Sequence, residues 1–376
     1  MRNMAYAVTV KNIKKIEGKD RIVYATFNEN AYGTIVSNTY KVGDVVVYFE
    51  VDSILPQEDR FEFLRKRCFN ERLNGFLIKP MKMAKFYSFG LTMTFDELNI
   101  KPVPANTDLT DTLKVRKNEA VSDKSPVENK SSLFKFCMKY KWLRPFAKFF
   151  IKTKEYVNFP VECISKSDEE NLYNHTDWFD KFHNDKSYMT IKMEGQSVTI
   201  LFKKKKFKNN FYVFGRNTLA SHECTEFMQQ YKEKLERLNT VNNTSYAIQG
   251  EFCSPKVQSG IYKNGIHFYV YRIRDISQQK DLCLEDMLYI CKEFGFEFVP
   301  LIEDKQLSDF KSIDELFQYV EKLYFSEGDV YKIKHTRTKN AVGVWHHEGI
   351  VVRNLDQTWS FKVKSKEYQL DWANRK

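Results

Sequence analysis

Apolar and polar residues alternate in short runs along the first hundred residues, which is the pattern of β-strands. The runs at 8–10, 22–26 and 45–51 are rich in β-branched and aromatic residues and are separated by turn signals. A later apolar stretch between 75 and 91 is placed to close the same sheet. Several short strands in so few residues predict a small barrel. We therefore assign residues 1–100 to an OB-fold domain that binds nucleic acid.

The strand pattern stops between residues 101 and 155. Residues 106–130 are polar and charged, with little to bury, which is typical of a linker. Residues 133–144 then alternate bulky apolar and basic side chains before Pro145. We interpret this amphipathic insert either as a linker helix packed between domains or as a basic arm that contacts a membrane surface or nucleic acid.

From residue 156 to 376 the pattern mixes strands with helices, and we assign this region to a second domain. Its β-branched and aromatic runs predict strands, and its longer amphipathic runs predict helices. The predicted strands are 190–191, 197–202, 245–248 and 268–271, with two more around 350 and 361. The predicted helices are 226–238, 282–294 and 313–324.

Charge and cysteine content narrow the class of protein. The 376 residues carry a net charge of +11, which favours a polyanionic partner such as nucleic acid, although a lysine-rich surface alone gives the same sum. The seven cysteines are scattered and form no CxxC pair, which indicates reduced thiols. The N-terminus lacks an apolar signal core, and no run is long enough to span a membrane. We expect a soluble, intracellular protein.

Strong polar residues stand beside the apolar runs of the second domain in a fixed order. They comprise one candidate lysine nucleophile, three carboxylates, an arginine and a closing pair of lysines. In chain order they are Lys192, Glu194, Arg216, Glu251, Glu348, Lys362 and Lys364. A lysine that attacks a nucleoside triphosphate needs a metal held by carboxylates, with cations around the phosphates. The set therefore favours a nucleotidyltransferase that carries AMP on Lys192.

The carboxylates and the closing lysines have separate expected roles. Hard cations prefer oxygen ligands and keep several waters, so Glu194, Glu251 and Glu348 are expected to bind the catalytic metal directly or through water. Lys362 and Lys364 alternate with apolar residues and so share one strand face, where a phosphate would relieve their repulsion. Each carboxylate taken alone is equally compatible with a solvated strand-end charge, and the lysine pair also fits an ordinary solvated strand face.

The adenine contact is less determined by the sequence. Tyr269 and Tyr271 share one face of a predicted strand, and either ring could stack on a base. The sequence pattern alone leaves this choice open.

The ordered motifs resemble those of a known superfamily. The order K-x-[DE]-G, Arg-Asn, G-E, an aromatic strand, E-G-x-V-x-[RK] and K-x-K resembles the covalent nucleotidyltransferases, which include ATP-dependent ligases and capping guanylyltransferases. It is most similar to RNA ligases related to T4 RNA ligase 2, in the branch with an N-terminal OB domain found in Deinococcus and Naegleria. Segments 40–56, 108–110 and 159–170 carry the likeness to that branch.

The resemblance implies a fold and a reaction. The fold would be α+β: an N-terminal OB-fold β-barrel, then an ATP-grasp-like nucleotidyltransferase domain of antiparallel sheets with flanking helices. Lys192 would attack the α-phosphate of ATP and release pyrophosphate. AMP would pass to an RNA 5′-phosphate, and a 3′-hydroxyl would displace it to seal the strand, as in RNA repair. The RNA partner would carry 3′-OH and 5′-phosphate ends, as in a nicked duplex, and the ligase is expected to act as a monomer.

The same resemblance assigns roles to the individual side chains. Arg216 would contact the nucleotide and Tyr271 would stack on adenine. The α-phosphate would be held by Lys362 and Lys364, which with Lys192 are the expected catalytic residues. The carboxylates Glu194, Glu251 and Glu348 would arrange the waters of a magnesium or manganese ion. The lysine must lose a proton before it attacks, and we expect nearby cations to favour its neutral amine.

Two positions depart from the family pattern. Asn171 stands where this branch commonly has an arginine that orients the triphosphate, and Ile191 replaces a glutamate that precedes the nucleophile in many relatives. The alternatives are a catalytically weak or inactive nucleotidyltransferase that acts as an RNA-binding module, a capping guanylyltransferase and a DNA ligase. The last two usually carry their OB domain after the K-x-K motif, whereas here the barrel-like segment comes first.

Overall fold

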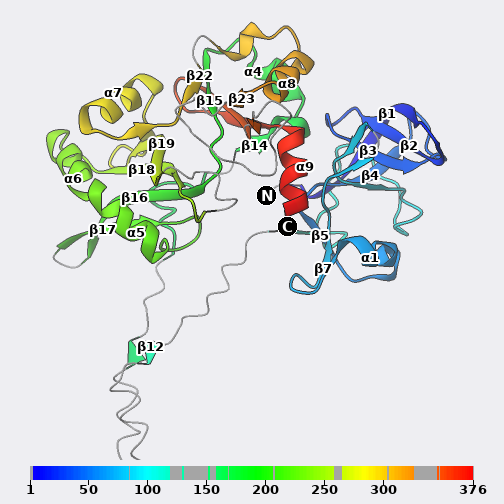
Figure 1. Cartoon of the computed structure of the whole chain (residues 1–376), viewed down its shortest axis with the longest axis horizontal. Coiled ribbons are helices and arrows are strands. Elements are labelled where there is room, and N and C mark those ends of the chain that lie inside the picture. The colour runs from blue at the N-terminus through cyan, green and yellow to red at the C-terminus, as the bar shows by residue number, and fades with distance from the viewer. Residues whose placement is uncertain are drawn as a thin grey trace, which may run out of the picture.

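The computed structural model describes most of the chain (Figure 1). The described ranges are 3–83, 85–118, 129–130, 151–152, 158–167, 169–205, 208–257, 265–302, 305–325, 345–346 and 348–375. The amphipathic insert predicted at 133–144 lies outside these residues, as does Asp168. Within the described part, no helix is long and apolar enough to cross a membrane.

The N-terminal domain is a nearly closed barrel, as predicted. Its antiparallel strands follow the order β10-β4-β1-β2-β3. They are β1 (Ala5–Ile16), β2 (Lys19–Phe27), β3 (Gly33–Ser37), β4 (Val45–Phe49) and β10 (Leu91–Met93). The hydroxyls of Thr34 on β3 and Thr92 on β10 are 2.5 Å apart, so the two edge strands meet. The OB-fold prediction is confirmed.

A smaller sheet packs below the barrel and extends the domain beyond residue 100. Its order is β11-β5-β7-β6, from β5 (Ser53–Leu55), β6 (Phe69–Asn70), β7 (Gly75–Leu77) and β11 (Arg116–Lys117). The 3₁₀-helix η1 (Asp59–Leu64), the short helix α1 (Arg65–Cys68) and the hairpin β8 (Met81–Met83)–β9 (Phe86–Ser88) complete the domain. Leu109, Leu113 and Val115 are buried in its core. The prediction of a linker starting at residue 101 is therefore corrected, because these three residues belong to the OB domain.

Two sheets form the ligase-like half of the chain. The first has the order β14-β26-β25-β15-β22, where β14 and β26 are parallel and the other pairs antiparallel. Its strands are β14 (Glu170–Asn171), β15 (Ser187–Ile191), β22 (Leu301–Ile302), β25 (Gly349–Asn354) and β26 (Ser360–Lys364). The second has the order β17-β16-β18-β19-β20, with β21 parallel to β19. Its strands are β16 (Gln196–Lys205), β17 (Lys208–Phe214), β18 (Tyr246–Cys253), β19 (His267–Asp275), β20 (Lys280–Asp281) and β21 (Glu297–Phe298).

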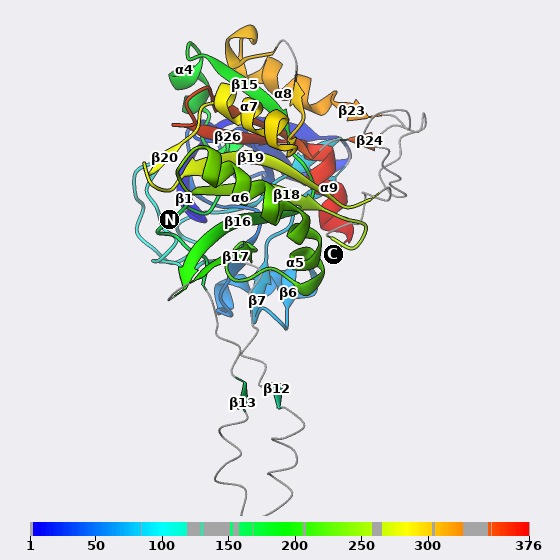
Figure 2. The same cartoon turned by 90° about the vertical axis from the view of Figure 1, so that its left-hand side faces the viewer.

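Helices cover the outer faces of these sheets, as Figures 1 and 2 show. On the second sheet lie α5 (His222–Met228), α6 (Lys232–Val241) and α7 (Leu284–Phe294), which share one apolar cluster with β18 and β19. A single helix predicted at 226–238 is instead α5, η4 (Gln229–Tyr231) and α6. The other helices in the described part of the chain are η3 (Leu172–Asn174), α4 (Asp177–Phe182), η5 (Leu307–Asp309), α8 (Ile313–Glu321) and α9 (Lys366–Arg375). Two short antiparallel strand pairs complete the description: β12 (Asn129–Lys130) pairs with β13 (Ile151–Lys152), and β23 (Tyr324–Phe325) pairs with β24 (Trp345–His346).

One hydrophobic cluster runs through both domains. Tyr32 of the OB domain stacks on Tyr173 of η3 with ring centroids 4.6 Å apart, and Tyr173 stacks on Phe317 of α8 at 3.9 Å. The hydroxyl of Tyr32 accepts a hydrogen bond from the amide of Asn171 at 2.8 Å. Helix α9 lies between the two halves (Figure 1). The domains therefore share a core.

Candidate active site

Lys192 directly follows β15, at the place where the two sheets of the second domain approach each other. Its backbone N–H donates to the carbonyl of Gly349 at the start of β25, at 2.9 Å. Ile191 and Met193 on either side are buried in an apolar cluster with Tyr271 and Cys253 from the second sheet. Lys192 is therefore held by a backbone hydrogen bond to β25, and its two neighbours in the chain pack against apolar side chains of the second sheet.

The carboxylate of Glu348 bridges two of the predicted lysines. Its Oε1 lies 3.0 Å from Nζ of Lys192 and 2.9 Å from Nζ of Lys364. The side chain of Glu348 is only 9% exposed. This contact follows from strand pairing, because Glu348 precedes β25, which pairs with both β15 and β26. Three of the residues singled out in the sequence thus lie in contact with one another.

The protonation of this group follows from its charges. Burial alone would lower the pKa of Lys192, but Glu348, Glu251 and Glu169 raise it above its usual value. Burial acts to raise the pKa of Glu348, yet Lys192 and Lys364 hold it at about 2. The expectation that nearby cations favour a neutral Lys192 amine is therefore wrong, because the carboxylates around the amine raise its pKa.

Glu251 faces Lys192 from the second sheet. It lies inside β18, opposite Ser197 and Tyr269. Burial, reinforced by Glu348 and Glu169, raises the pKa of Glu251 to about 8 against the opposing effect of Lys192. A nearby cation, such as a bound metal ion, would stabilise the ionised form of this buried carboxylate.

The K-x-E-G motif packs directly against β18. A Cβ on Gly195 would lie 2.7 Å from Cγ of Glu251 and 2.7 Å from the carbonyl oxygen of Phe252. Glycine is therefore required there by close approach. The preceding residue, Glu194, is almost fully buried. The motif thus keeps Glu194 and Glu251 on neighbouring segments.

Tyr271 is fixed by two hydroxyl contacts beside this site. Its hydroxyl lies 2.7 Å from Oγ of Ser167 and 2.8 Å from Oγ of Ser197. It is the extra residue of a β-bulge, because Val270 and Arg272 pair with successive residues of β18. Bulges re-aim side chains and are frequent beside active sites. Tyr269 packs against the same apolar cluster but stacks on His267 instead.

A further ion pair, which was not predicted from the sequence, lies at the first sheet. Arg353 of β25 donates to Oε1 of Glu169 at 2.7 Å, and its guanidinium lies 5.6 Å from the ring centroid of Tyr271. Burial would raise the pKa of Glu169, but Arg353, Lys362 and Lys192 lower it. Arg353 is the final residue of the E-G-x-V-x-[RK] motif, so a signal for it was present in the sequence.

The remaining predicted cations line a cavity of about 210 Å³ between the domains. Lys362 and Lys364 of β26 reach it from the ligase side together with Arg216. The OB domain contributes Glu50, Asp52, Lys117 and Asn118 to the same lining. Asn171, which replaces the usual arginine, also borders the cavity. Its amide is hydrogen bonded to Tyr32, so this position now contacts the OB domain.

The donor set fits a hydrated hard cation better than a direct protein cage. Among the described residues, no group of three or more histidine, cysteine, aspartate or glutamate side chains is close enough to hold a metal directly. Magnesium commonly keeps several waters and uses only one or two carboxylates with substrate phosphates. Glu251 and Glu348, which face the same lysine, suit such coordination.

Two segments of the chain match known protein families. Residues 4–95 match an OB-fold domain family, and residues 185–366 match the family described as RNA ligase. No curated protein matches the sequence.

Solved structures of the Naegleria gruberi RNA ligase have a similar fold. A substituted form with AMP and Mn superimposes with a TM-score of 0.74 at 22% identity, covering 98% of both chains. The form with pyrophosphate gives 0.73 at 21% identity, again over 98% of both chains. Residues 185–366 thus match the RNA ligase family behind a segment that matches an OB-fold domain family, and the chain as a whole has the fold of the Naegleria ligase.

Proposed function

We propose that this protein is an ATP-dependent RNA ligase that seals 3′-OH and 5′-phosphate RNA ends through a lysyl-AMP. One observation carries the proposal: a lysine held among buried carboxylates, with Lys364 on the same carboxylate. The RNA ligase family match supports the RNA substrate. The similar Naegleria ligase has been solved with ATP and Mn and with AMP and Mn, which supports the choice of nucleotide and metal.

In the first step, Nζ of Lys192 attacks the α-phosphorus of ATP. A nitrogen–phosphorus bond forms, the bond from the α-phosphorus to its bridging oxygen breaks, and pyrophosphate leaves. The ammonium of Lys192 must first lose a proton. Glu251, which interacts with the same amine and whose pKa burial raises to about 8, is a better proton acceptor than Glu348, whose pKa the two lysines hold at about 2. Lys362 and Lys364 offset the charge that develops on the phosphate oxygens.

The metal would act on the same phosphate. Magnesium or manganese, when bound, neutralises negative charge on the phosphate oxygens and helps to orient the leaving pyrophosphate. Glu251 and Glu348, with Glu194, would hold it through coordinated water. The raised pKa of Glu251 supports this role, because a cation offsets the cost of burying its charge.

The nucleoside would lie against the apolar cluster beside Lys192. We propose that Tyr271 stacks on adenine, since two serine hydroxyls fix its ring in place. Ile191 gives an apolar contact where other family members use a glutamate. Arg216, at the cavity with Lys362, would contact the nucleotide.

In the two later steps AMP passes to RNA and is then released. A 5′-phosphate oxygen of RNA attacks the phosphorus of lysyl-AMP and frees Lys192. A 3′-hydroxyl then attacks the RNA 5′-phosphate, and AMP leaves as the strand closes. We propose that the protein performs these steps as a monomer in RNA repair, for example at a nick in a duplex.

Covalent labelling tests the first step directly. The protein is incubated with magnesium and ATP labelled at the α-phosphate, with labelled GTP in parallel, and run on a denaturing gel. Lys192→Ala should lose the labelled band. Lys186→Ala, an exposed lysine just before β15, should keep it. No band with wild-type protein shown to be folded would refute the proposal, and a band with GTP alone would indicate a guanylyltransferase.

Strand sealing tests the later steps. A nicked RNA duplex with 3′-OH and 5′-phosphate ends should give a joined product, and a 5′-hydroxyl nick should not. Joining of the 5′-hydroxyl substrate would contradict the assigned chemistry. Size-exclusion chromatography with light scattering would check the monomer.

A further inference from the structure

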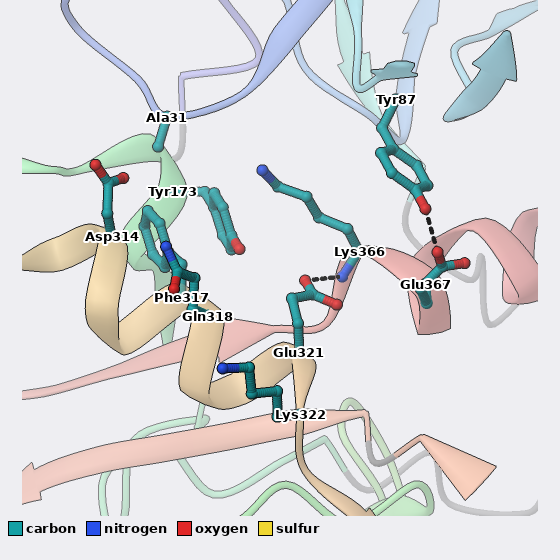
Figure 3. Close-up of a pocket in the computed structure, with 10 residues that line it drawn as sticks. All are labelled: Ala31, Tyr87, Tyr173, Asp314, Phe317, Gln318, Glu321, Lys322, Lys366 and Glu367. Atoms are coloured by element: carbon teal, nitrogen blue, oxygen red, sulfur yellow. Dashed lines mark hydrogen bonds between the residues drawn. The ribbon is translucent and has the colours of Figure 1, made fainter. Parts of the chain in front are cut away.

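A second cavity lies between the domains, lined by other residues than the nucleotide site. It encloses about 620 Å³, within the range of small-ligand pockets. Ala31 and Tyr87 of the OB domain form one wall (Figure 3). The ligase side supplies Tyr173 and Phe317, together with polar residues of α8 and α9. The proposed reaction uses none of these residues.

Lys366 is the central cation of this cavity. Figure 3 shows its side chain extending into the space between Tyr173 and Tyr87. Its Nζ lies 4.8 Å from the ring centroid of Tyr173, and no described carboxylate forms an ion pair with it. Burial lowers the pKa of Lys366, although Glu321 and Asp314 act to raise it. An anion bound here would stabilise the charged amine.

The hydroxyl of Tyr173 is a second group in this cavity that a bound anion would stabilise. The hydroxyl of Tyr173 is buried and has no hydrogen-bond partner among the described residues. A buried hydroxyl without a partner carries a desolvation cost that a ligand can remove. Its ring is already stacked on both faces, by Tyr32 and by Phe317. The ring faces are thus covered, and the edge with the hydroxyl is the part of Tyr173 left to face the cavity.

Two of the three carboxylates in the lining already have donors. Glu321 accepts hydrogen bonds from the hydroxyl of Ser365 at 3.0 Å and from the backbone N–H of Lys366 at 2.6 Å. Glu367 accepts from Tyr87 and forms an ion pair with Lys82 at 3.5 Å. Only the exposed Asp314 has no such contact among the described residues.

The lining therefore offers an ammonium and a hydroxyl to a phosphate, and a carboxylate to a hydroxyl group. We propose that this cavity binds one nucleotide of the RNA strand, with the phosphate on Lys366 and Tyr173 and the ribose toward Asp314. Lys366 lies two residues beyond Lys364, so the cavity adjoins the segment that is proposed to hold the reacting phosphate. This inference rests on the proposed RNA ligase function.

Binding of a nicked RNA duplex tests the inference. The duplex carries fluorescein, and its affinity is measured by anisotropy in EDTA without ATP, so that no reaction occurs. Lys366→Met keeps the shape of the side chain and removes its charge. We expect about tenfold weaker binding. The slope of log affinity against log salt should become less steep by about 0.7–0.9, as for one lost phosphate contact.

Lys311→Met is the matched control, because Lys311 is an exposed lysine next to α8 that does not line the cavity. It should bind RNA like the wild type. Equal binding by Lys366→Met and wild type would overturn the inference, as would equal losses in both lysine variants. If Lys366→Met does not fold, Tyr173→Phe decides: about fivefold weaker RNA binding supports the site, and unchanged binding overturns it.

Free phosphate is the competing source of the anion. Calorimetric titration of wild type and Lys366→Met with inorganic phosphate distinguishes free phosphate from an RNA phosphate as the bound anion. Phosphate binding that depends on Lys366, with RNA affinity unchanged in the variant, would overturn the assignment to RNA. The same protein preparation is tested for AMP labelling. An unlabelled wild type defeats the proposed function, whereas a labelled wild type with unchanged Lys366→Met binding defeats only the cavity inference.

Discussion

Replacing Arg353 by methionine should destabilise the ligase domain more than any loss of a surface ion pair. Arg353 and Glu169 are 2.7 Å apart, and their side chains are only 6% and 19% exposed. Arg353→Met removes the guanidinium but keeps the length of the side chain. The carboxylate of Glu169 then stays buried without its main partner.

The expected loss follows from the charge left behind. Two unit charges about 4 Å apart interact by about 4 kcal/mol at an effective dielectric constant of 20. Breaking a buried pair by removing one partner costs about 3–5 kcal/mol. Lys362 and Lys192 also lower the pKa of Glu169, so they offset part of the loss. We therefore expect a decrease of about 3 kcal/mol in the free energy of unfolding.

Urea unfolding followed by tryptophan fluorescence measures this loss. The double variant Glu169→Gln with Arg353→Met should recover about half of it, since no buried charge is left unpaired. Lys203→Met is the control, because its pair with Glu162 is 44% and 58% exposed and should contribute less than about 1 kcal/mol. A loss under about 1 kcal/mol for Arg353→Met, or no recovery in the double variant, would refute this reasoning.

The pH dependence of this effect has a definite sign. The folded-state pKa of Glu169 is lowered, so its contribution is present above its unfolded-state pKa and is lost as pH falls through the folded value. The difference in stability between wild type and Arg353→Met should therefore shrink below about pH 4. A difference that stays constant from pH 7 to pH 3 would show that the loss is one of packing.

Two further predictions concern the backbone and the thiols. Gly349→Ala should cost about 4 kcal/mol or more, because its φ is +143° and a Cβ would lie 2.0 Å from the carbonyl oxygen of Val363, whereas Gly18→Ala, in open space at φ +71°, should cost about 1–2 kcal/mol. Thermal unfolding of both variants checks this, and equal losses would contradict it. Burial raises the pKa of Cys224 and Cys291 to about 12, so at pH 9 only about one thiol in a thousand is ionised. Mass spectrometry after treatment with a thiol reagent should find both unmodified unless urea is present, and rapid modification of the folded protein would contradict the burial.

Most strands could be predicted because each has its own local pattern. The alternation Phe361-Lys362-Val363-Lys364 requires both lysines on one face of β26, and the structure has Phe361 and Val363 fully buried. The K-x-E-G motif likewise marked the segment after β15. In these places local sequence and tertiary structure agree.

The charge environment of the nucleophile could not be read from spacing. Lys192 and Glu348 are 156 positions apart, and only the pairing of β15 with β25 brings them together. Both residues could be singled out from the sequence, but their ion pair could not. The pKa of Lys192 was therefore expected to be lowered, whereas the carboxylates raise it. Glu169 and Arg353 were overlooked for the same reason, since a buried ion pair across 184 positions has no local pattern.

The extent of the OB domain was underestimated for a different reason. The region from residue 106 is polar on average, which is typical of a linker. Leu109, Leu113 and Val115 nevertheless suffice to anchor it in the core, and β11 then pairs with β5. Average polarity hides a few well-placed apolar residues.

The core shared by the two domains limits how freely they can be exchanged. Tyr32 is stacked between Phe89 of its own domain and Tyr173 of the other. A ligase half expressed alone would expose Tyr173 and the apolar surface around it, a patch prone to aggregation. A chimera with a foreign OB domain would need an aromatic ring in the position of Tyr32. The two domains are thus separate segments of the sequence but do not fold independently. A substitution on one side of their shared interface would require a compensating substitution on the other side.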